Sequence, residues 1–263
     1  MKKNRQLLLA LLRMRLQHLT VFRLSFFGAF FVDGSLFLIQ LLLFDVLYGQ
    51  VDSIGGWSKG QMIVFVGTFS LVNALCMSTF FFGIISLPEK ICTGSLDQYL
   101  VKPSSLLLRL SFEKVNPGSL PLIALSLVIL LRGVALMGQP VSVFAVIAYI
   151  IAVLLMTLLW YDLMLIFRTL PFFILSAAAL GHVEESFIEM SMKVPGVIFQ
   201  GFWKVLFYGL LPYGLIATLP TQIITGAFSA GGIAWGLLIV ALFTLGALRF
   251  FRFGLSQYKS TGS

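Results

Sequence analysis

Three acidic residues stand inside stretches that are otherwise strongly apolar. Asp33 lies in a run over residues 24–48, and Glu184 and Glu185 lie in the second half of a run over residues 170–192. An ionisable side chain within a membrane-spanning segment is costly, so it marks a functional site by default. These carboxylates could line a route for a cationic or amphiphilic substrate, or carry protons. A structural role stays open as well, because Asp33 could pair with a neighbouring span.

The sequence lacks the residues that nucleotide binding, zinc binding and disulfide formation would require. The chain has no G-x-x-x-x-G-K-[ST] loop, whose backbone donors and lysine hold nucleotide phosphates. It has no H-E-x-x-H motif, and two cysteines and two histidines are too few for a zinc centre. Cys76 falls in an apolar segment and Cys92 in a surface segment, so a structural disulfide is not expected. We therefore expect neither enzymatic activity nor a metal site, nor a nucleotide cofactor held by this chain.

The composition indicates a membrane protein. Hydrophobic residues make up 59% of the 263 positions and charged residues 11%, where a soluble domain carries roughly a quarter charged residues. Several stretches reach the length of about 20 apolar residues that a spanning helix needs. We expect an all-α integral membrane protein with one membrane domain over residues 1–263. The net charge of +8 then reflects topology and not nucleic-acid binding.

Apolar stretches predict six transmembrane helices. These are residues 24–48, 61–87 (ended by Pro88), 117–137, 141–167, 170–192 and 233–250. Residues 1–23 offer a broad apolar face interrupted too often by arginine for a span, and basic residues scattered through them do not fit a cleavable signal. This segment is predicted to be an amphipathic helix in the membrane interface.

A polar stretch, residues 88–105, separates the second and third predicted spans. It is too mixed in character to lie in hydrocarbon, and it predicts a short amphipathic helix at the membrane surface. An apolar anchor inside a polar rim is the usual layout of a protein contact. The anchor would be Ile91, Leu96, Tyr99 and Leu100, and the rim Glu89, Lys90, Asp97 and Lys102. Gly94 would allow a bend or close approach, and Pro103 would end the helix.

The segment over residues 193–229 is apolar but punctuated by Pro195, Pro212 and Pro220. Proline interrupts the hydrogen-bond ladder of a helix, and broken helices at membrane depth are tolerated only where protein or a water-filled cavity satisfies the freed groups. We therefore expect short re-entrant or surface helices between the fifth and sixth spans.

Positive charges orient the six spans. With both termini inside, fourteen lysines and arginines lie in inward segments, against Lys59, Arg132, Lys193 and Lys204 outside. Cytoplasmic loops carry the excess of basic residues, so both termini and residues 88–105 are predicted to be cytoplasmic and residues 193–229 to lie on the outer side.

Two motifs on this topology resemble the permease subunits of type-2 ABC exporters. The likeness is to a subgroup with a G-x-L-D-x-x-L-x-x-P surface motif and a downstream P-x-x-I-F…P…P pattern. The first motif is matched by Gly94, Leu96, Asp97, Leu100 and Pro103, and the second by Pro195, Ile198, Phe199, Pro212 and Pro220. The resemblance covers essentially the whole chain.

This resemblance implies a division of labour. The cytoplasmic helix would be a coupling helix that docks on a separate P-loop ATPase subunit, present in two copies, which would bind ATP and Mg. The outer broken helices would act as a gate at the exit of the translocation route. A second permease, either a copy of this chain or a related one, is implied too. Such an exporter would move a drug-like, amphiphilic or lipid-like substrate outward across the bacterial cytoplasmic membrane.

An ion-coupled secondary transporter is the alternative, since Asp33, Glu184 and Glu185 could carry protons. Many secondary transporters show internal repeats with interrupted spans in corresponding positions. Here the breaks cluster between the fifth and sixth predicted spans only, which favours the ABC permease.

Overall fold

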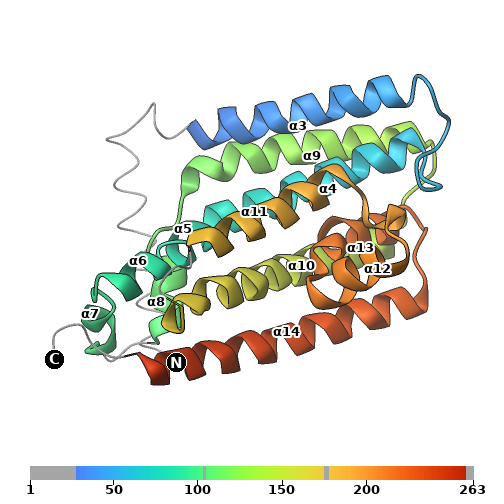
Figure 1. Ribbon diagram of the computed structural model, residues 1–263. Coiled ribbons are helices and arrows are strands. Elements are labelled where there is room, and N and C mark those ends of the chain that lie inside the picture. Colours follow the sequence, from blue (N-terminus) through green and yellow to red (C-terminus); the bar gives the residue numbers. More distant parts are fainter. Residues whose placement is uncertain (1–27, 103–104, 175–177, 259–263) are drawn as a thin grey trace.

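The computed structural model describes residues 28–102, 105–174 and 178–258, and these fold into a helical bundle (Figure 1). The predicted interfacial helix over residues 1–23 lies outside the described residues, as does Pro103. Within the described residues there is no β-strand, only an isolated bridge between Ile54 and Trp57.

Six long helices of the described part form the bundle. They are α3 (Gly28–Leu47), α4 (Lys59–Thr79), α9 (Leu120–Met137), α10 (Val143–Thr169), α11 (Ala178–Lys193) and α14 (Ala230–Gln257). All except α11 are long and apolar enough to cross a membrane. Five of the predicted spans thus overlap candidate spans, in α3, α4, α9, α10 and α14. The span predicted to start at Pro117 does start there, with the 3₁₀ turn η1 (Pro117–Ser119) leading into α9.

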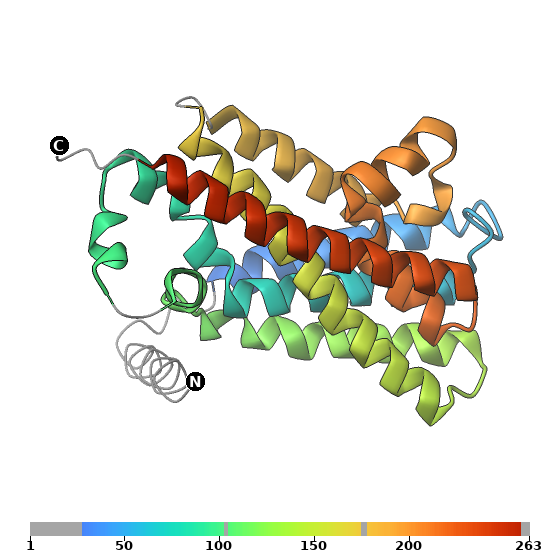
Figure 2. The same ribbon diagram turned by 90° about the horizontal axis from the view of Figure 1, so that it is seen from below.

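Short elements gather at the two ends of the bundle. One end, which we call the α7 end, carries α5 (Phe81–Ile84), α6 (Leu87–Cys92), α7 (Asp97–Leu100) and α8 (Leu106–Phe112). The opposite end, the α13 end, carries η3 (Gly196–Ile198), α12 (Gly201–Val205), the π-helical turn η4 (Leu206–Leu210), η5 (Pro212–Gly214) and α13 (Leu215–Ile224). Figures 1 and 2 place the start of α3 and the end of α14 together at the α7 end.

The structure corrects the predicted boundaries in three places. The second span does not continue to Leu87, because the helix breaks at Phe80 and resumes as α5. Pro88 does not end a span but lies in the first turn of α6, where its missing N–H would have had no partner in the helix. The predicted single helix over residues 88–105 is two helices, α6 and α7, since Gly94 adopts a left-handed conformation (φ 71°) between them.

The predicted fifth span, residues 170–192, also differs. Leu170–Phe172 form the 3₁₀ turn η2 at the end of α10, and α11 has 16 residues, among them the ionisable His182, Glu184 and Glu185. By length and composition α11 is not a candidate span, whereas residues 201–210 with 212–224 qualify as a pair bent by 84°. The described chain therefore has five to six candidate spans.

Helix α4 is the buried axis of the bundle. Its apolar window is 83% buried, against 22–33% for the other candidate spans. Glycines let its backbone approach that of α9: a Cβ on Gly67 would lie 2.8 Å from the Leu130 nitrogen, and one on Gly133 would lie 2.7 Å from the Val64 nitrogen. Small residues are the usual means of close helix packing in membranes, where apolar burial alone gives little drive.

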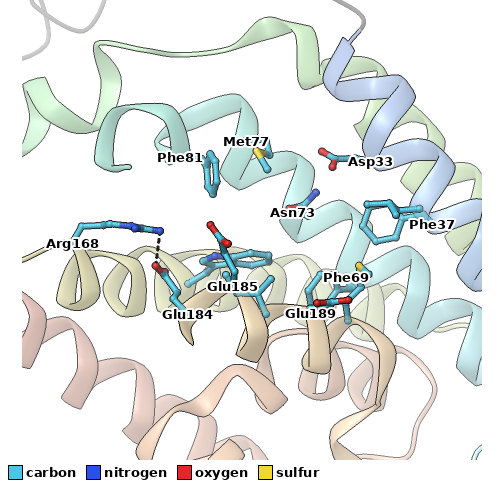
Figure 3. Close-up of a pocket in the computed structure, with 14 residues that line it drawn as sticks. Asp33, Phe37, Phe69, Asn73, Met77, Phe81, Arg168, Glu184, Glu185 and Glu189 are labelled. Atoms are coloured by element: carbon cyan, nitrogen blue, oxygen red, sulfur yellow. Dashed lines mark ion pairs between the residues drawn. The ribbon is translucent and has the colours of Figure 1, made fainter. Parts of the chain in front are cut away.

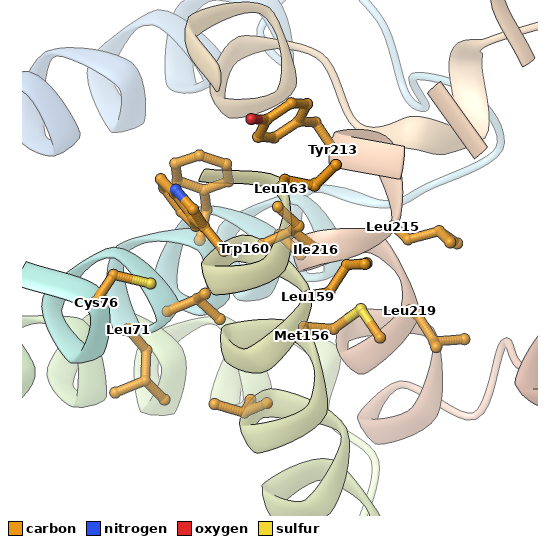
Figure 4. Close-up of a cluster of buried hydrophobic side chains, with 14 of the residues drawn as sticks. Leu71, Cys76, Met156, Leu159, Trp160, Leu163, Tyr213, Leu215, Ile216 and Leu219 are labelled. Carbon is orange, nitrogen blue, oxygen red and sulfur yellow. The ribbon is translucent and has the colours of Figure 1, made fainter. Parts of the chain in front are cut away.

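A cross-helix hydrogen bond of 2.7 Å between Ser70 and Ser126 strengthens the same α4–α9 contact. On the other side of α4, α10 packs against α13 through a cluster of large side chains that includes Trp160, Leu163 and Ile216 (Figure 4). The remaining long helices expose much of their apolar surface, as helices that face lipid do.

We expect Gly67→Ala and Gly133→Ala to destabilise the bundle, because the added methyl groups meet backbone atoms that cannot move aside. Overpacking of this kind costs about 1–3 kcal/mol, which lowers the unfolding temperature by roughly 5 °C. The buried Cys76 on α4 is a reporter: in a Cys92→Ser background, a thiol-reactive dye labels it only as the helices separate on heating.

Gly246→Ala on α14 is the matched control, because nothing lies within 4 Å of the Cβ that it would add. An unfolding temperature for Gly67→Ala equal to that of Gly246→Ala would contradict the close α4–α9 contact.

Candidate functional site

A cavity of about 290 Å³ lies between α3, α4, α10 and α11 (Figure 3). Its walls combine aromatic and acidic side chains. They include Phe37, Phe69, Phe81 and Trp160, together with Asp33, Glu184, Glu185 and Glu189. The three acids singled out from the sequence, Asp33, Glu184 and Glu185, therefore line one cavity, although they come from helices far apart in the chain.

Glu184 is held by the protein itself. Its side chain is 1% exposed and forms an ion pair of 2.8 Å with Arg168 at the end of α10. The hydroxyl of Tyr213, in the turn η5, donates a hydrogen bond of 3.4 Å to its other oxygen. A buried carboxylate needs such partners, because they offset the free energy lost when it leaves water. Glu184 thus joins α10, α11 and the broken segment at the α13 end.

The other cavity acids are more accessible. Glu185 is exposed and pairs with His182 one turn earlier on α11 at 3.3 Å, and Glu189 is exposed and pairs with Lys193. Asp33 lies on the opposite wall, on α3, next to Asn73 of α4 (Figure 3). With four acids and the single base Arg168 among its lining residues, the described cavity is acidic overall.

The broken segment packs closely against the bundle. Pro195, Phe199, Pro212 and Pro220 are buried, and Ile198 is 38% exposed. Phe199 stacks on Phe207 with ring centroids 4.3 Å apart, and the Gly196 N–H donates a 2.8 Å hydrogen bond to Thr218. Pro220 does not break a helix, since α13 continues through it. The sharp bend occurs at Leu211, directly before Pro212.

At the α7 end, the motif residues divide into buried and exposed sets. Ile91, Leu96 and Lys90 are buried within the chain and Tyr99 is half-buried, whereas Leu100 is 44% exposed and Val101 is 82% exposed. The left-handed Gly94 turns the chain back so that the Leu96 N–H donates to the Lys90 carbonyl at 3.1 Å. Apolar surface for a partner thus lies at Leu100 and Val101.

Asp97, the acidic residue of the motif, has a partner within the chain. Partial burial and the Asp97 carboxylate raise the pKa of the Tyr258 hydroxyl, which places the two groups side by side. Asp97 of α7 therefore lies near Tyr258, the residue that follows α14. Glu89, beside the anchor, is exposed.

One further sequence motif has a structural role. Gly56–Gly60 spell G-x-S-x-G, yet Ser58 is the N-cap of α4: its hydroxyl accepts from the Gln61 N–H, and the Gln61 side chain accepts from the Ser58 N–H. The described residues contain no group of three or more histidine, cysteine or acidic side chains that could hold a metal ion.

Comparison with known families gives one decisive match. The model of a family described as ABC-2 family transporter protein matches residues 35–262. The chain belongs to this family. Comparison with curated proteins and with solved structures found no match.

Membership of the ABC-2 family makes the chain a membrane transport component that associates with an ATPase. The coarse prediction from the sequence, a multi-pass permease of an ABC transporter, is thereby confirmed. The matched region contains the broken segment, both helices of the polar stretch and all the cavity-lining residues except Asp33.

Sequence reasoning missed the partners that this ABC-2 chain provides for its own motif and cavity residues. Arg168 stands near Asp162 in the sequence, but its ion pair is with Glu184 on the next helix. Nothing in the sequence indicated Tyr213 as a partner of Glu184, apart from its position next to Pro212. Charge complementarity between an intramembrane base and an intramembrane acid was the available clue to the first pair.

We expect Arg168→Leu to lower the free energy of unfolding by about 3–5 kcal/mol, because it leaves the Glu184 carboxylate buried without its counter-charge. Labelling of Cys76 on heating, in the Cys92→Ser background, measures the loss. Glu185→Gln on the same helix is the control and should change stability by no more than about 0.5 kcal/mol, since that side chain is exposed. Equal stability of the two variants would show that the ion pair is dispensable.

Proposed function

We propose that this chain is the permease subunit of an ATP-driven exporter of the bacterial cytoplasmic membrane. Two copies of a separate ATPase subunit bind ATP and Mg, and a second permease, identical or related, completes the transporter. The substrate, a drug-like, amphiphilic or lipid-like molecule, moves outward. The observation that carries the proposal is the ABC-2 match over residues 35–262 of a chain without a phosphate-binding loop.

The surface proposed for ATPase docking is the exposed part of α6 and α7. Leu100 and Val101 present apolar side chains, and Glu89, Gln98 and Lys102 are exposed around them. An apolar centre with a polar rim fits a protein partner. The less exposed motif residues in the segment from α6 to α7 then shape this surface and do not touch the ATPase; they are Ile91, Gly94, Leu96 and Tyr99.

Charge supports a cytoplasmic α7 end. Of the described basic residues, Lys90, Lys102, Arg109, Lys114, Arg168, Arg249 and Arg252 belong to segments that the topology assigns to the inner side. Only four described basic residues fall on the outer side, namely Lys59, Arg132, Lys193 and Lys204, and the excess on the inner side is what the positive-inside rule requires.

The cavity supports an amphiphilic cation as the substrate. Aromatic faces attract cations and apolar groups alike, and the surrounding carboxylates supply negative charge. Asp33 is the acid on the α3 wall, and Glu185 the exposed acid on the α11 wall. Tyr213 connects Glu184 to the broken segment, which we assign as the outer gate through Pro195, Ile198, Phe199, Pro212 and Pro220.

The exposed charged side chains of α11 favour the presence of a second permease. His182, Glu185, Glu189 and Lys193 are all exposed on it, and charged side chains do not face hydrocarbon without a large cost. A water-filled route between two permeases would solvate this face of α11.

Replacing the exposed apolar pair should abolish docking without unfolding the chain. We expect Leu100→Ser with Val101→Ser to reduce recovery of the ATPase with the tagged permease at least about ten-fold, the effect of losing some 1.4 kcal/mol of contact. Mass spectrometry of the purified complex measures recovery. Phe202→Ser, an exposed apolar residue at the α13 end, is the control. Undiminished recovery with the double variant would move the docking surface elsewhere.

Asp33→Asn should weaken transport of the amphiphilic cation ethidium into inside-out vesicles by about ten-fold, corresponding to about 1.4 kcal/mol for a lost charge contact. Asp45→Asn is the control on the same helix, because Asp45 is exposed and pairs with Lys59. ATP should drive the uptake, and an ionophore that collapses the proton gradient should not stop it. Uptake that needs the gradient but no ATP would establish the ion-coupled alternative.

A further inference from the structure

Four side chains outside the spans form a compact cluster at the α7 end. Tyr99 on α7 donates a hydrogen bond of 2.9 Å to Glu113, which directly follows α8. Lys90 on α6 and Arg109 on α8 each lie 4.9 Å from the centre of the Tyr99 ring. The cluster therefore joins both helices of the docking segment to α8.

The Tyr99 hydroxyl is protonated, as the hydrogen bond that it donates to Glu113 requires. Burial and the Glu113 carboxylate raise the pKa of Tyr99 to about 12, so its hydroxyl keeps its proton at neutral pH and acts as the donor. Burial also lowers the pKa of Lys90, whose ammonium donates to Ser86 at 3.0 Å. A cation against the face of a tyrosine contributes roughly 0.5–2 kcal/mol, more where water is excluded.

Helix α8 is in turn fixed to the membrane-spanning helices. A Cβ on Gly83 of α5 would overlap the Leu110 carbonyl oxygen, so the two backbones are in direct contact. Ser111 shares a 3.0 Å hydrogen bond with Tyr161 of α10. Four residues after α8, the Asn116 N–H donates to the carbonyl of Ser78 near the end of α4 at 3.2 Å.

Helix α6 also contacts α10 and η2 directly, so α8 is one of the connections between the docking segment and the spans, and it is the one that runs through the Tyr99 cluster. Movement of α6 and α7 has to displace α8 or break the Tyr99 cluster, and movement of α8 has to displace the ends of α4 and α10. A further connection passes through Tyr258, which lies near Asp97 and packs against Phe172 of η2 with ring centroids 5.9 Å apart.

We propose that α8 carries the movement of the docking segment to the spans, and that Tyr99 and Glu113 are positioning residues for ATP-driven transport. This inference rests on the proposed function, because it requires an ATPase that pushes on α6 and α7. The cluster is a mechanical connection and not a docking surface, so its loss should separate ATPase binding from movement of the spans.

The test follows movement without knowledge of the substrate. A cysteine at the exposed Ser186 of α11, beside the cavity acid Glu185, in a Cys92→Ser background reports access to this face. In the co-purified complex with an intact cluster, ATP with vanadate should change its labelling rate at least five-fold. With Tyr99→Phe or Glu113→Leu the change should fall below two-fold, while ATPase recovery and ATP hydrolysis stay within two-fold.

Three further variants sharpen the result. The double variant Tyr99→Phe with Glu113→Leu should lose no more of the labelling change than either single variant, since each single substitution already removes the same hydrogen bond. Glu113→Gln keeps an oxygen acceptor and should retain most of the labelling change. Lys114→Gln, which removes a charge beside Glu113, should show the same labelling change as the chain with an intact cluster.

A full labelling change in Tyr99→Phe and Glu113→Leu would overturn the inference and leave the proposed function intact. Loss of ATPase recovery in these variants would overturn it too, because the cluster would then belong to the docking surface. Failure of the unmodified chain to recover any ATPase would instead refute the proposed function, and the inference with it.

Discussion

The close contact between the backbones of α4 and α9 is the constraint on which the rest of the bundle depends. Gly67 and Gly133 remove the side chains that would hold the two helices apart, and Ser70 and Ser126 close the gap with a hydrogen bond. Because α9 covers one side of α4 at this distance, α10 and α13 are left to cover the other. The buried axis therefore fixes where the cavity forms, between α4 and the helices that cannot approach it as closely.

Charge is handled differently in the two parts of the molecule. In the bundle, Glu184 is neutralised by Arg168 and accepts a hydrogen bond from Tyr213, so the chain itself offsets the free energy of burying this carboxylate. At the α7 end, Lys90 and Arg109 lie against the ring of Tyr99, where apolar stems and charged heads are both accommodated. The same kinds of residue thus hold helices together at depth and shape a surface outside the spans.

The sequence predicts what depends on composition and local order, and fails where partners are distant. Residues 117–137 were predictable as a span because Pro117 and the polar residues before it mark its start. The break at Phe80 was not predictable, since neither proline nor glycine stands there and the close packing of α5 on α8 is a tertiary contact. Leu96 has the character of an exposed anchor in the sequence, but the turn at Gly94 directs it inward. Glu184 looked like a route residue, yet its partners come from two other elements.

The bend at Leu211 divides the broken segment at the α13 end into two short pieces. Residues 201–210 and 212–224 are each about half the length of a spanning helix, and Tyr213 and Gly214 at the turn between them are buried. Because the turn after the bend is buried in protein, the backbone groups freed there are shielded by the chain itself. In the outer gate that we propose, each half of this bent pair covers a depth of at most roughly 15 Å, against the roughly 30 Å of a full span, so the barrier that has to open is about as thick as a single leaflet.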